Sequence, residues 1–513
     1  MNLSYHMQRS GRLYPARPAL AIGTSVVATY AECADRVSRL AASFRDTLGL
    51  KTGDRVALAM QNTPEFIELL YACWHAGLVA VPTNAKLHRD EFAFILNDSG
   101  ARAAFTTSKL TGTIERARNH DLQHIIEVSS PEYVALTKRE PIAVIPCLPD
   151  DSAWLFYTSG TTGRPKGATL THRNLMALML GYFSDVDPGA PWASQLHAAP
   201  LSHGSGLYAL PNVARGACHV IPESSGFEAE EVFELIEAWP HLSFFAAPTM
   251  VKRLLDTPRE SDTSNLKLII YGGGPMYVED CLVALERFGP KLSQLYGQGE
   301  SPMTITALSA EMHADNTNPR WMERLASVGV AQTPVNVRVV DTQLNPVPIG
   351  ETGEIIVAGD AVMAGYWRNP EATQQAVVDG WLRTGDLGAL DEDGFLTLKD
   401  RSKDMIISGG TNIYPREVEE VLLRHPEVQE VSVIGRPDRE WGESVVAYVV
   451  SELSPAQLRE QLDAFCIEHM ARFKRPKDYQ LIEALPKNNY GKVLKTALRD
   501  LDCNDKDETR SSS

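Results

Sequence analysis

The sequence lacks the usual features of a secreted or membrane-spanning protein. Its seven cysteines are odd in number, widely spread and never in a Cys-x-x-Cys pair, which indicates a reducing compartment without a structural zinc site. No uncharged apolar run approaches the roughly 18 residues that a spanning helix needs. Residues 1–21 hold no apolar block of signal-peptide length, and the polar segment 504–513 resembles a frayed end rather than a targeting signal. We therefore expect a cytoplasmic protein with no membrane span.

Positive charge is also scarce in this sequence. Lys and Arg number 49 against 65 Asp and Glu, which gives a net charge of −16. A field of that sign repels polyanions, so we expect neither nucleic acid nor an anionic membrane as a partner. A nucleotide is compatible with this charge, because a loop of backbone N–H groups can bind phosphates without net positive charge.

The length of 513 residues predicts at least two domains, because single hydrophobic cores stop growing at roughly 250 to 300 residues. Up to about residue 327, apolar periodicity predicts alternating helices and strands. The predicted helices are 31–48, 66–75, 175–183 and 232–238, and the predicted strands are 55–60, 78–82, 242–245 and 266–270. This alternation is typical of mainly parallel sheets covered by helices, with ligands at the carboxyl ends of strands.

The pattern changes twice in the second half of the chain. Short strands at 335–340, 353–357 and 395–398 predict a small barrel-like β part. From Arg401 on, helices 415–423 and 455–471 with strands 428–434 and 445–450 predict a compact α+β domain of about 110 residues. The fold class is thus α/β, with a large N-terminal domain over 1–400 and a small, mobile C-terminal domain over 401–513. The charged run 399–404 marks the boundary.

A glycine-rich loop is the most informative segment. The short apolar strand 153–157 leads into residues 158–167, which hold three Thr, one Ser, three Gly and one Lys. Glycine allows close backbone approach, hydroxyls donate hydrogen bonds to phosphate oxygens, and lysine adds a mobile positive charge. The loop does not follow the Walker pattern. An ordinary turn is the alternative, but this length and composition favour a phosphate-binding loop.

This loop resembles the signature loop of the adenylate-forming superfamily, the AMP-binding enzymes that include acyl-CoA synthetases, adenylation domains of peptide synthetases and firefly-type luciferases. Four further motifs follow in the family's order. They are Tyr296–Glu300, Trp381–Asp386, Asp400–Ile406 with Gly409 and Gly410, and Pro486–Lys492. The resemblance extends from about Tyr30 to Leu498 and is closest to bacterial ligases of aromatic and medium-chain acids.

The resemblance implies a two-step reaction that uses ATP, Mg²⁺ and coenzyme A. A carboxylate attacks the α-phosphorus of ATP to give acyl-AMP and pyrophosphate, and a thiol then displaces AMP. The partners implied are small molecules alone: a carboxylic acid, ATP and CoA. The sequence leaves the oligomeric state open, a homodimer included.

The resemblance also implies residue roles. Glu300 would bind Mg²⁺ through oxygen, Asp386 would accept hydrogen bonds from the ribose hydroxyls, Arg401 would steady the ribose and phosphates, and Lys492 would bridge the carboxylate and the α-phosphate. The β- and γ-phosphates would be held by Thr158, Ser159, Gly160, Thr161, Thr162, Gly163 and Lys166, and the adenine slot would be lined by Gly272, Gly273, Gly274, Pro275 and Tyr296.

A second group of roles concerns the hinge and the thiol. Lys403 stands at the family's hinge, about which the small domain turns after adenylation. Gly409 and Gly410 would form the thiol tunnel. Candidates for CoA are Trp441, Phe473, Arg475 and Lys477, because aromatic and basic side chains suit an adenine and a 3′-phosphate; ordinary surface positions are the alternative for these four.

The acid is expected near residues 201–206, with Phe244, Phe245, Gly272 to Gly274 and Gly297 as neighbours. The resemblance implies that His203 would lie beside the acid's carboxylate; a hydrogen-bonded structural histidine is the alternative. No Lys or Arg in these stretches would meet a second carboxylate, which favours an apolar monoacid, aromatic or medium-chain.

Two positions depart from the family: Gly299 replaces the usual Thr before the glutamate, and Asp400 replaces a frequent Gly. The first removes one expected phosphate contact.

The predicted function is therefore an AMP-forming acid:CoA ligase. A stand-alone adenylation enzyme that loads a carrier protein in trans is one alternative, and a luciferase-type oxygenase is a weaker one. A catalytically inactive nucleotide-binding regulator belongs to a different class, and the presence of Glu300, Asp386 and Lys492 argues against it.

Overall fold

A computed structural model describes residues 1–502 of the chain apart from 159–164, 191, 275, 402–403, 409–410, 439–440 and 489–492, and it describes only the backbone at 400 and 401. The chain divides into two compact units. The large unit comprises 1–275, 282–337 and 357–382, and the small unit comprises 276–281, 338–356 and 383–513. The predicted boundary after residue 400 stays a prediction.

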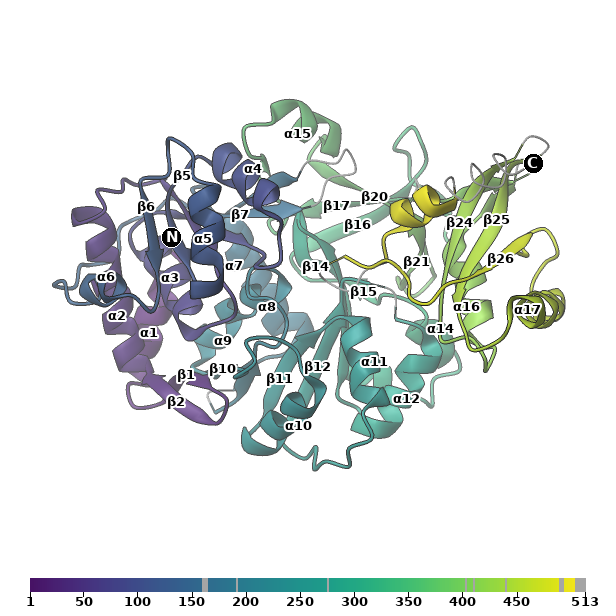
Figure 1. The fold of residues 1–513 in the computed structure, drawn as a ribbon, viewed down its shortest axis with the longest axis horizontal. Coiled ribbons are helices and arrows are strands. Elements are labelled where there is room, and N and C mark those ends of the chain that lie inside the picture. Colours follow the sequence, from purple (N-terminus) through teal and green to yellow (C-terminus); the bar gives the residue numbers. More distant parts are fainter. Residues whose placement is uncertain are drawn as a thin grey trace. The chain divides into compact units, whose positions relative to one another are not determined.

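A nine-stranded sheet of the large unit carries most of the segments predicted to bind ligands. Its order is β15-β14-β13-β12-β11-β9-β10-β1-β2 (Figure 1), and the strands from β13 to β1 are parallel to their neighbours, whereas β2, β14 and β15 are antiparallel. The bounds are β1 Pro18–Ile22, β2 Ser25–Thr29, β9 Ser194–Leu196, β10 Cys218–Ile221, β11 Leu242–Ala246, β12 Leu266–Gly272, β13 Leu292–Gln298, β14 Ser301–Leu308 and β15 Val330–Ala331.

A seven-stranded sheet, ordered β18-β8-β7-β4-β3-β5-β6, forms the other half of the large unit. Alternate residues of β3 face opposite sides: Ala57 and Ala59 pack against α4 and α5 in one buried cluster, as expected for a strand buried on both faces. The bounds are β3 Arg55–Ala59, β4 Val79–Thr83, β5 Ala101–Thr106, β6 His124–Glu127, β7 Ser152–Thr158, β8 Lys166–Thr171 and β18 Gly365–Tyr366.

Several of the helices in this region begin at clear capping residues. Thr29 and Glu32 form a reciprocal capping box at α2, and Thr171 with Asn174 forms one at α7, which satisfies backbone N–H groups that lack partners inside the helix. The helices are α1 Tyr5–Leu13, α2 Tyr30–Asp46, α3 Pro64–His75, α4 Arg89–Ser99, α5 Ser108–Arg116, α6 Pro131–Leu136, α7 His172–Gly181, the π-helix η1 Tyr182–Val186, α8 Gly204–Leu207, α9 Ala209–Arg215, α10 Ala229–Ala238, α11 Pro248–Asp256, α12 Val278–Phe288, α13 Ala310–Ala314, α14 Trp321–Leu325 and α15 Pro370–Ala376.

The predicted small β part is a five-stranded sheet, ordered β16-β17-β20-β19 with β21 beside β20. Its register pairs Asp386 with Arg401 across β20 and β21. The bounds are β16 Val335–Val340, β17 Gly353–Gly359, β19 Val377–Val378, β20 Trp381–Leu390 and β21 Leu396–Arg401.

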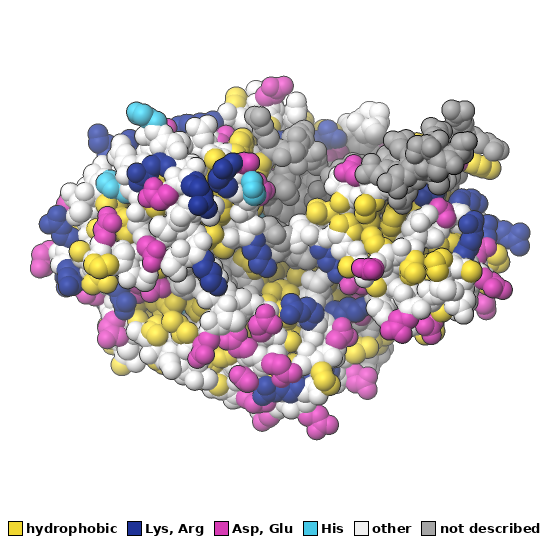
Figure 2. Space-filling view, viewed as in Figure 1, with side chains coloured by type: hydrophobic (Ala, Val, Ile, Leu, Met, Phe, Trp, Pro, Cys, Tyr) yellow, Lys and Arg dark blue, Asp and Glu magenta, His cyan; other side chains and the backbone are white. Residues whose placement is uncertain are grey.

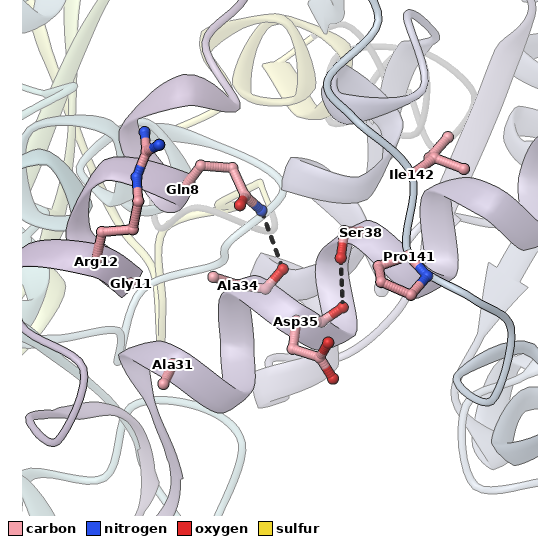
Figure 3. A pocket seen from close by; sticks show the side chains of 9 residues that line it. All are labelled: Gln8, Gly11, Arg12, Ala31, Ala34, Asp35, Ser38, Pro141 and Ile142. Atoms are coloured by element: carbon pink, nitrogen blue, oxygen red, sulfur yellow. Dashed lines mark hydrogen bonds between the residues drawn. The ribbon is translucent and has the colours of Figure 1, made fainter.

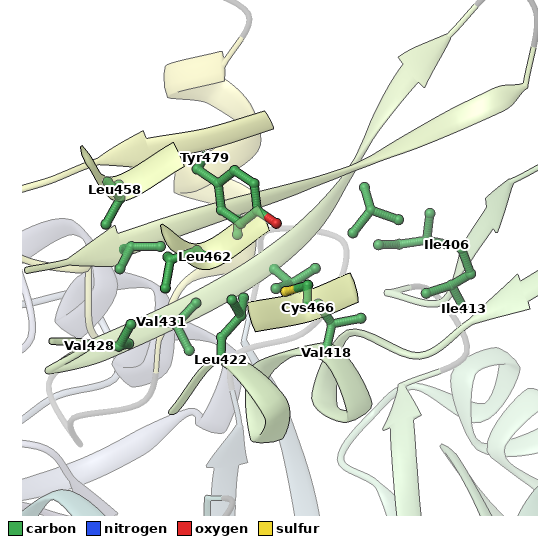
Figure 4. Packing of buried hydrophobic residues seen from close by; sticks show 14 residues of the cluster. Ile406, Ile413, Val418, Leu422, Val428, Val431, Leu458, Leu462, Cys466 and Tyr479 are labelled. Carbon is green, nitrogen blue, oxygen red and sulfur yellow. The ribbon is translucent and has the colours of Figure 1, made fainter. Parts of the chain in front are cut away.

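The last part of the small unit folds around its own core. Apolar residues of α16 and α17, among them Leu422 and Leu462, pack with Val431 of the sheet (Figure 4). The sheet order is β23-β22-β25-β24 with β26 parallel to β25. The bounds are β22 Ile406–Ser408, β23 Thr411–Ile413, α16 Pro415–Leu423, β24 Glu430–Asp438, β25 Gly442–Val450, α17 Pro455–His469 and β26 Asp478–Leu481.

The predicted α/β fold class is confirmed: parallel sheets with helices, a small β part and an α+β C-terminal part are all present. The sequence-based prediction missed α1, β1 and β2.

Among the described residues, no helix combines the length and the apolar character needed to cross a membrane. Acidic and basic side chains are interspersed on the face shown in Figure 2.

Candidate active site

The carboxyl ends of four neighbouring strands bring the predicted segments of the large unit together. Strands β9, β11, β12 and β13 are parallel, so their carboxyl ends lie along one edge of the sheet, where ligands bind in open α/β folds. The segment with His203 follows β9, and Phe245 stands near the end of β11. The glycines 272–274 lie at the end of β12, and Tyr296 and Glu300 lie at the end of β13 and just beyond it.

Two of the predicted glycines are required by close backbone contacts. A Cβ at Gly272 would lie 2.4 Å from the carbonyl oxygen of Leu295, and one at Gly297 would lie 2.4 Å from the backbone nitrogen of Met303. Gly273 has a φ of +80°, which favours glycine. Close packing therefore explains Gly272 and Gly297, and backbone conformation explains Gly273. Their predicted role in binding adenine or the acid stays a prediction.

His203 is placed beside the strand that leads into the phosphate loop. It precedes α8, and its ring centroid lies 4.7 Å from that of Phe156 on β7. Burial lowers the pKa of His203 to about 4, because desolvation disfavours the charged imidazolium. The imidazole is therefore neutral near pH 7 and can donate a hydrogen bond without carrying charge.

The strands on either side of the predicted phosphate loop pair with each other. Strands β7 and β8 pair antiparallel, with Thr158 opposite Lys166 and Tyr157 opposite Gly167. The Tyr157 hydroxyl donates to Asp98 Oδ2 at 2.6 Å, and its ring occupies the space that a side chain at Gly167 would need, 3.0 Å from the Cβ position. The stem of the loop is thereby fixed, and it holds Thr158 and Lys166 at the loop's two ends.

Glu300 has an ordered partner close to this stem. The Tyr366 hydroxyl donates a hydrogen bond to Glu300 Oε1 at 2.6 Å, and Lys166 Nζ lies 5.1 Å from the centroid of the Tyr366 ring. Burial and the Glu300 charge raise the pKa of Tyr366, so the phenol stays protonated. Tyr366 thus connects the predicted metal ligand with the predicted phosphate lysine.

Gly299 departs from the family pattern for a steric reason. A Cβ at this position would lie 2.2 Å from Thr158 Cγ2 and 2.9 Å from Phe156 Cδ1, distances that real Cβ contacts essentially never show. Side chains from β7 therefore fill the space beside the residue before Glu300. The same closeness shows that the β13–β14 turn and the phosphate-loop stem are neighbours.

In the small unit, Asp386 and Arg401 occupy opposed positions on β20 and β21. Asp386 is 8% exposed. Its backbone N–H donates to Thr384 Oγ1 at 3.1 Å, and that hydroxyl donates to the carbonyl oxygen of Ile355 at 2.7 Å, which fixes the local backbone.

Two of the four CoA candidates line a cavity of about 380 Å³ in the small unit. They are Trp441, which is 52% exposed, and Lys477. The other two do not line it: Arg475 pairs with Asp463, and Phe473 is an exposed ring. The complete lining is Ser408, Arg436, Asp438, Trp441, Ser444, Arg459, Lys477 and Asp478.

A second cavity, of about 440 Å³, lies in the large unit and holds none of the predicted residues. Gln8 on α1 donates to the carbonyl oxygen of Ala34 on α2 at 3.0 Å, and the Ser38 hydroxyl donates to the carbonyl oxygen of Asp35 at 2.8 Å (Figure 3). The polar groups drawn with these bonds are thus already paired.

Several predicted residues lie outside the described part of the chain. They are Ser159, Gly160, Thr161, Thr162, Gly163, Pro275, Lys403, Gly409, Gly410 and Lys492, and for Arg401 the side chain is outside it. Sequence reasoning missed Tyr366 and Phe156. Tyr366 belongs to the run Gly365-Tyr366-Trp367, whose glycine and two aromatics were the available signal.

The family model described as AMP-binding enzyme matches residues 7–367, and the model described as AMP-binding enzyme C-terminal domain matches residues 417–492. The chain is 36% identical over 495 residues to a feruloyl-CoA synthase of an Amycolatopsis species, covering 96% of this chain and 97% of that protein. It is 34% identical over 487 residues to the long-chain-fatty-acid–CoA ligase FadD13 of Mycobacterium tuberculosis, covering 93% of each.

Among solved structures, the o-succinylbenzoate CoA synthetase of Bacillus subtilis, in complex with its acyl-adenylate intermediate, superposes with a TM-score of 0.84 at 32% identity, covering 96% of this chain and 97% of that one. These similarities extend over nearly the whole chain. They confirm the family and the enzyme class predicted from the sequence. The chain therefore belongs to the AMP-binding enzymes, the adenylate-forming family that includes the acyl-CoA synthetases.

Proposed function

We propose that this protein activates an apolar monocarboxylic acid with ATP and transfers the acyl group to CoA, and that aromatic acids are favoured over long aliphatic ones. The observation that carries the proposal is the group formed by Glu300, Tyr366 and Lys166 beside the stem of the phosphate loop. The Glu300 carboxylate can bind a cation and the Lys166 ammonium can bind phosphates, and the Tyr366 phenol lies beside both. This combination suits a bound triphosphate.

In the first step a carboxylate oxygen of the acid attacks the α-phosphorus of ATP. The bond from that phosphorus to the bridging oxygen breaks, pyrophosphate leaves and acyl-AMP forms. Because negative groups approach one another, cations and hydrogen-bond donors must already be in place. We assign Thr158 and Lys166 to the phosphates and Asp386 to the ribose. Lys492 is assigned to the reacting carboxylate and α-phosphate.

Mg²⁺ fits the residues present. Glu300 offers the oxygen donor that this ion prefers, and one or two carboxylates completed by substrate phosphates and water are a common set for it. Within the described residues no group of three or more His, Cys, Asp or Glu could hold a metal ion, so a pre-formed protein cage is not the arrangement proposed. When bound, Mg²⁺ supplies positive charge that offsets the charge of the triphosphate.

In the second step the thiol sulfur of CoA attacks the acyl carbon, and the bond to AMP breaks. We assign the cavity that contains Trp441 and Lys477 to the nucleotide end of CoA. The indole offers a face for an adenine, and Lys477 has no ion pair among the described residues, so its charge is available for a phosphate. We assign His203 to the acid, whose carboxylate the neutral imidazole meets as a donor.

Pyrophosphate release over a panel of benzoates, cinnamates and fatty acids, with and without CoA, tests this function. We expect acid-dependent pyrophosphate release that needs Mg²⁺, and an acyl-CoA product when CoA is added. Product analysis with a phosphopantetheinyl carrier protein in place of CoA provides the comparison. Acyl transfer to the carrier and not to CoA, or no acid-dependent release at all, would contradict the proposal.

A further inference from the structure

Tyr208 carries a buried hydroxyl group that has no partner within the described part of the chain. The residue follows α8 and precedes α9, it is 0% exposed, and its phenol oxygen lacks any hydrogen bond. An unpaired buried hydroxyl is unfavourable because its water contacts are lost without replacement. In native structures such a group calls for an explanation, and a bound ligand or an ordered water is the usual one.

The surroundings of Tyr208 are aromatic and aliphatic. Its ring stacks on Phe245 of β11, with centroids 5.8 Å apart and planes 25° apart. Tyr182 meets it edge-on, with centroids 5.7 Å apart. The cluster is completed by buried Leu268, Ile270, Leu295 and Ala307 and by partly buried Phe183, Val186, Met303 and Ala310. A hydrogen bond made in such a setting is more selective than one made in water.

Phe245 connects this cluster with the segments assigned to the acid. A Cβ at Gly204, next to His203, would lie 3.7 Å from the Phe245 ring, and a Cβ at Gly273 would lie 4.0 Å from it. The Phe245 side chain is only partly buried. The ring on which Tyr208 stacks therefore lies beside both the loop after β9 and the glycines after β12.

His203 and Tyr208 stand at the two ends of one short helix. They flank the four-residue helix α8 and stand five positions apart. An acid whose carboxylate meets His203 would therefore have the rest of its body near α8 and Tyr208. A long aliphatic chain could not form a hydrogen bond with the Tyr208 hydroxyl.

We propose that the Tyr208 hydroxyl hydrogen-bonds a hydroxyl group at the far end of the substrate, so that the preferred substrates are phenolic aromatic acids. This inference rests on the ligase function proposed above and names its substrate class. The flat faces of Phe245 and Tyr208 match an aromatic ring, and the substrate hydroxyl supplies the partner that Tyr208 lacks.

The test compares 4-hydroxycinnamate with cinnamate, which differ by one hydroxyl, and uses kcat/KM from pyrophosphate release. The unmodified enzyme is expected to prefer 4-hydroxycinnamate. Tyr208→Phe should lower kcat/KM for 4-hydroxycinnamate by about 10- to 100-fold and leave that for cinnamate within about twofold. The selectivity is thereby lost while the reaction itself persists.

Tyr182→Phe is the matched control. Tyr182 lies in the same cluster and is also buried, and its hydroxyl already donates a hydrogen bond to Asp187 Oδ2 at 3.4 Å. Removing that hydroxyl alters stability but should leave the ratio of the two kcat/KM values unchanged. Thermal unfolding of both variants reports any loss of folding, so a lower activity on both acids can be separated from a change in selectivity.

Two outcomes would overturn the assignment of Tyr208. An unchanged ratio in Tyr208→Phe would mean that an ordered water pairs with the phenol, and a preference of the unmodified enzyme for octanoate over both cinnamates would exclude phenolic acids as the substrate class. Both outcomes leave the ligase function standing, because acid-dependent pyrophosphate release is still seen. Failure of the ligase function itself would show as no release with any acid.

Discussion

The Tyr366 hydroxyl donates a 2.6 Å hydrogen bond to Glu300 Oε1, and 66 positions of sequence separate the two residues. Tyr366 thereby fixes one oxygen of the carboxylate proposed to bind Mg²⁺. Removing the phenol oxygen in Tyr366→Phe frees Glu300 to adopt other rotamers. We expect about tenfold slower pyrophosphate release and a higher Mg²⁺ concentration for half-maximal rate, measured by titrating Mg²⁺ at saturating ATP.

Tyr157→Phe is the control for that change. It removes an equally short tyrosine–carboxylate hydrogen bond, which Tyr157 of β7 donates to Asp98. This variant should lower the melting temperature without raising the Mg²⁺ requirement. If both variants shift the Mg²⁺ requirement alike, the effect arises from the β7–β8 strand pair and not from the orientation of Glu300.

Gly299→Thr restores the residue that the family usually has, and we expect it to reduce the rate of adenylation. The new Cβ would lie 2.2 Å from Thr158 Cγ2, so the phosphate-loop stem must shift. Thr158→Ser removes that methyl group and keeps the hydroxyl. The double variant should recover activity relative to Gly299→Thr alone, a non-additivity typical of contacting residues. Additive losses in ATP–pyrophosphate exchange would contradict this steric explanation.

The buried carboxyl group of Glu68 should make the free energy of unfolding depend on pH. It is 1% exposed on α3, with Arg36 of α2 at 3.1 Å, and burial raises its pKa to about 8 in spite of that guanidinium. The folded state therefore holds a proton that the unfolded state releases near the ordinary glutamate pKa of 4.5. Stability is highest below the unfolded pKa and falls as pH rises between the two values, by roughly 1.4 kcal/mol per unit at most.

Glu68→Gln removes this proton linkage. Unfolding by denaturant should show that the variant gains stability over the unmodified protein as pH rises from 5 to 8. Glu65→Gln, three residues earlier on the same helix and partly exposed, is the control and should follow the unmodified protein. Parallel pH profiles for Glu68→Gln and the unmodified protein would show that Glu68 does not carry the dependence.

Local sequence signals predicted the helices and strands that bury large apolar side chains. Helix α16 was predicted at its observed bounds, Pro415–Leu423, because a proline at the first turn and periodic Val and Leu mark it. Helix α1 was missed because small residues make part of its buried face. Ser10 and Gly11 are buried there, and a Cβ at Gly11 would lie 2.6 Å from Ala34 Cβ, so close helix packing replaces the hydrophobic signal.

The site could be predicted only where a motif is continuous in the sequence. The loop 158–167 and Glu300 lie in such motifs. The partners of Glu300 and of Phe245 lie tens of residues away in the sequence, at Tyr366 and Tyr208. Apolar periodicity carries no information about the partner of a tyrosine hydroxyl group. Their roles follow from tertiary contacts alone.

Lys492→Ala separates the two half-reactions. Lys492 is assigned to the carboxylate and the α-phosphate, so its loss should slow acyl-AMP formation by about 100-fold or more and leave thioester formation from supplied acyl-AMP largely intact. Lys487→Ala is the control: five residues earlier, its ammonium pairs with Glu430 at 2.6 Å, and it should affect neither step by more than about twofold. ATP–pyrophosphate exchange measures the first step, and CoA-dependent AMP release from acyl-AMP measures the second. Normal exchange in Lys492→Ala would remove this lysine from the adenylation step, and equal losses in both half-reactions would point to a disturbed fold instead.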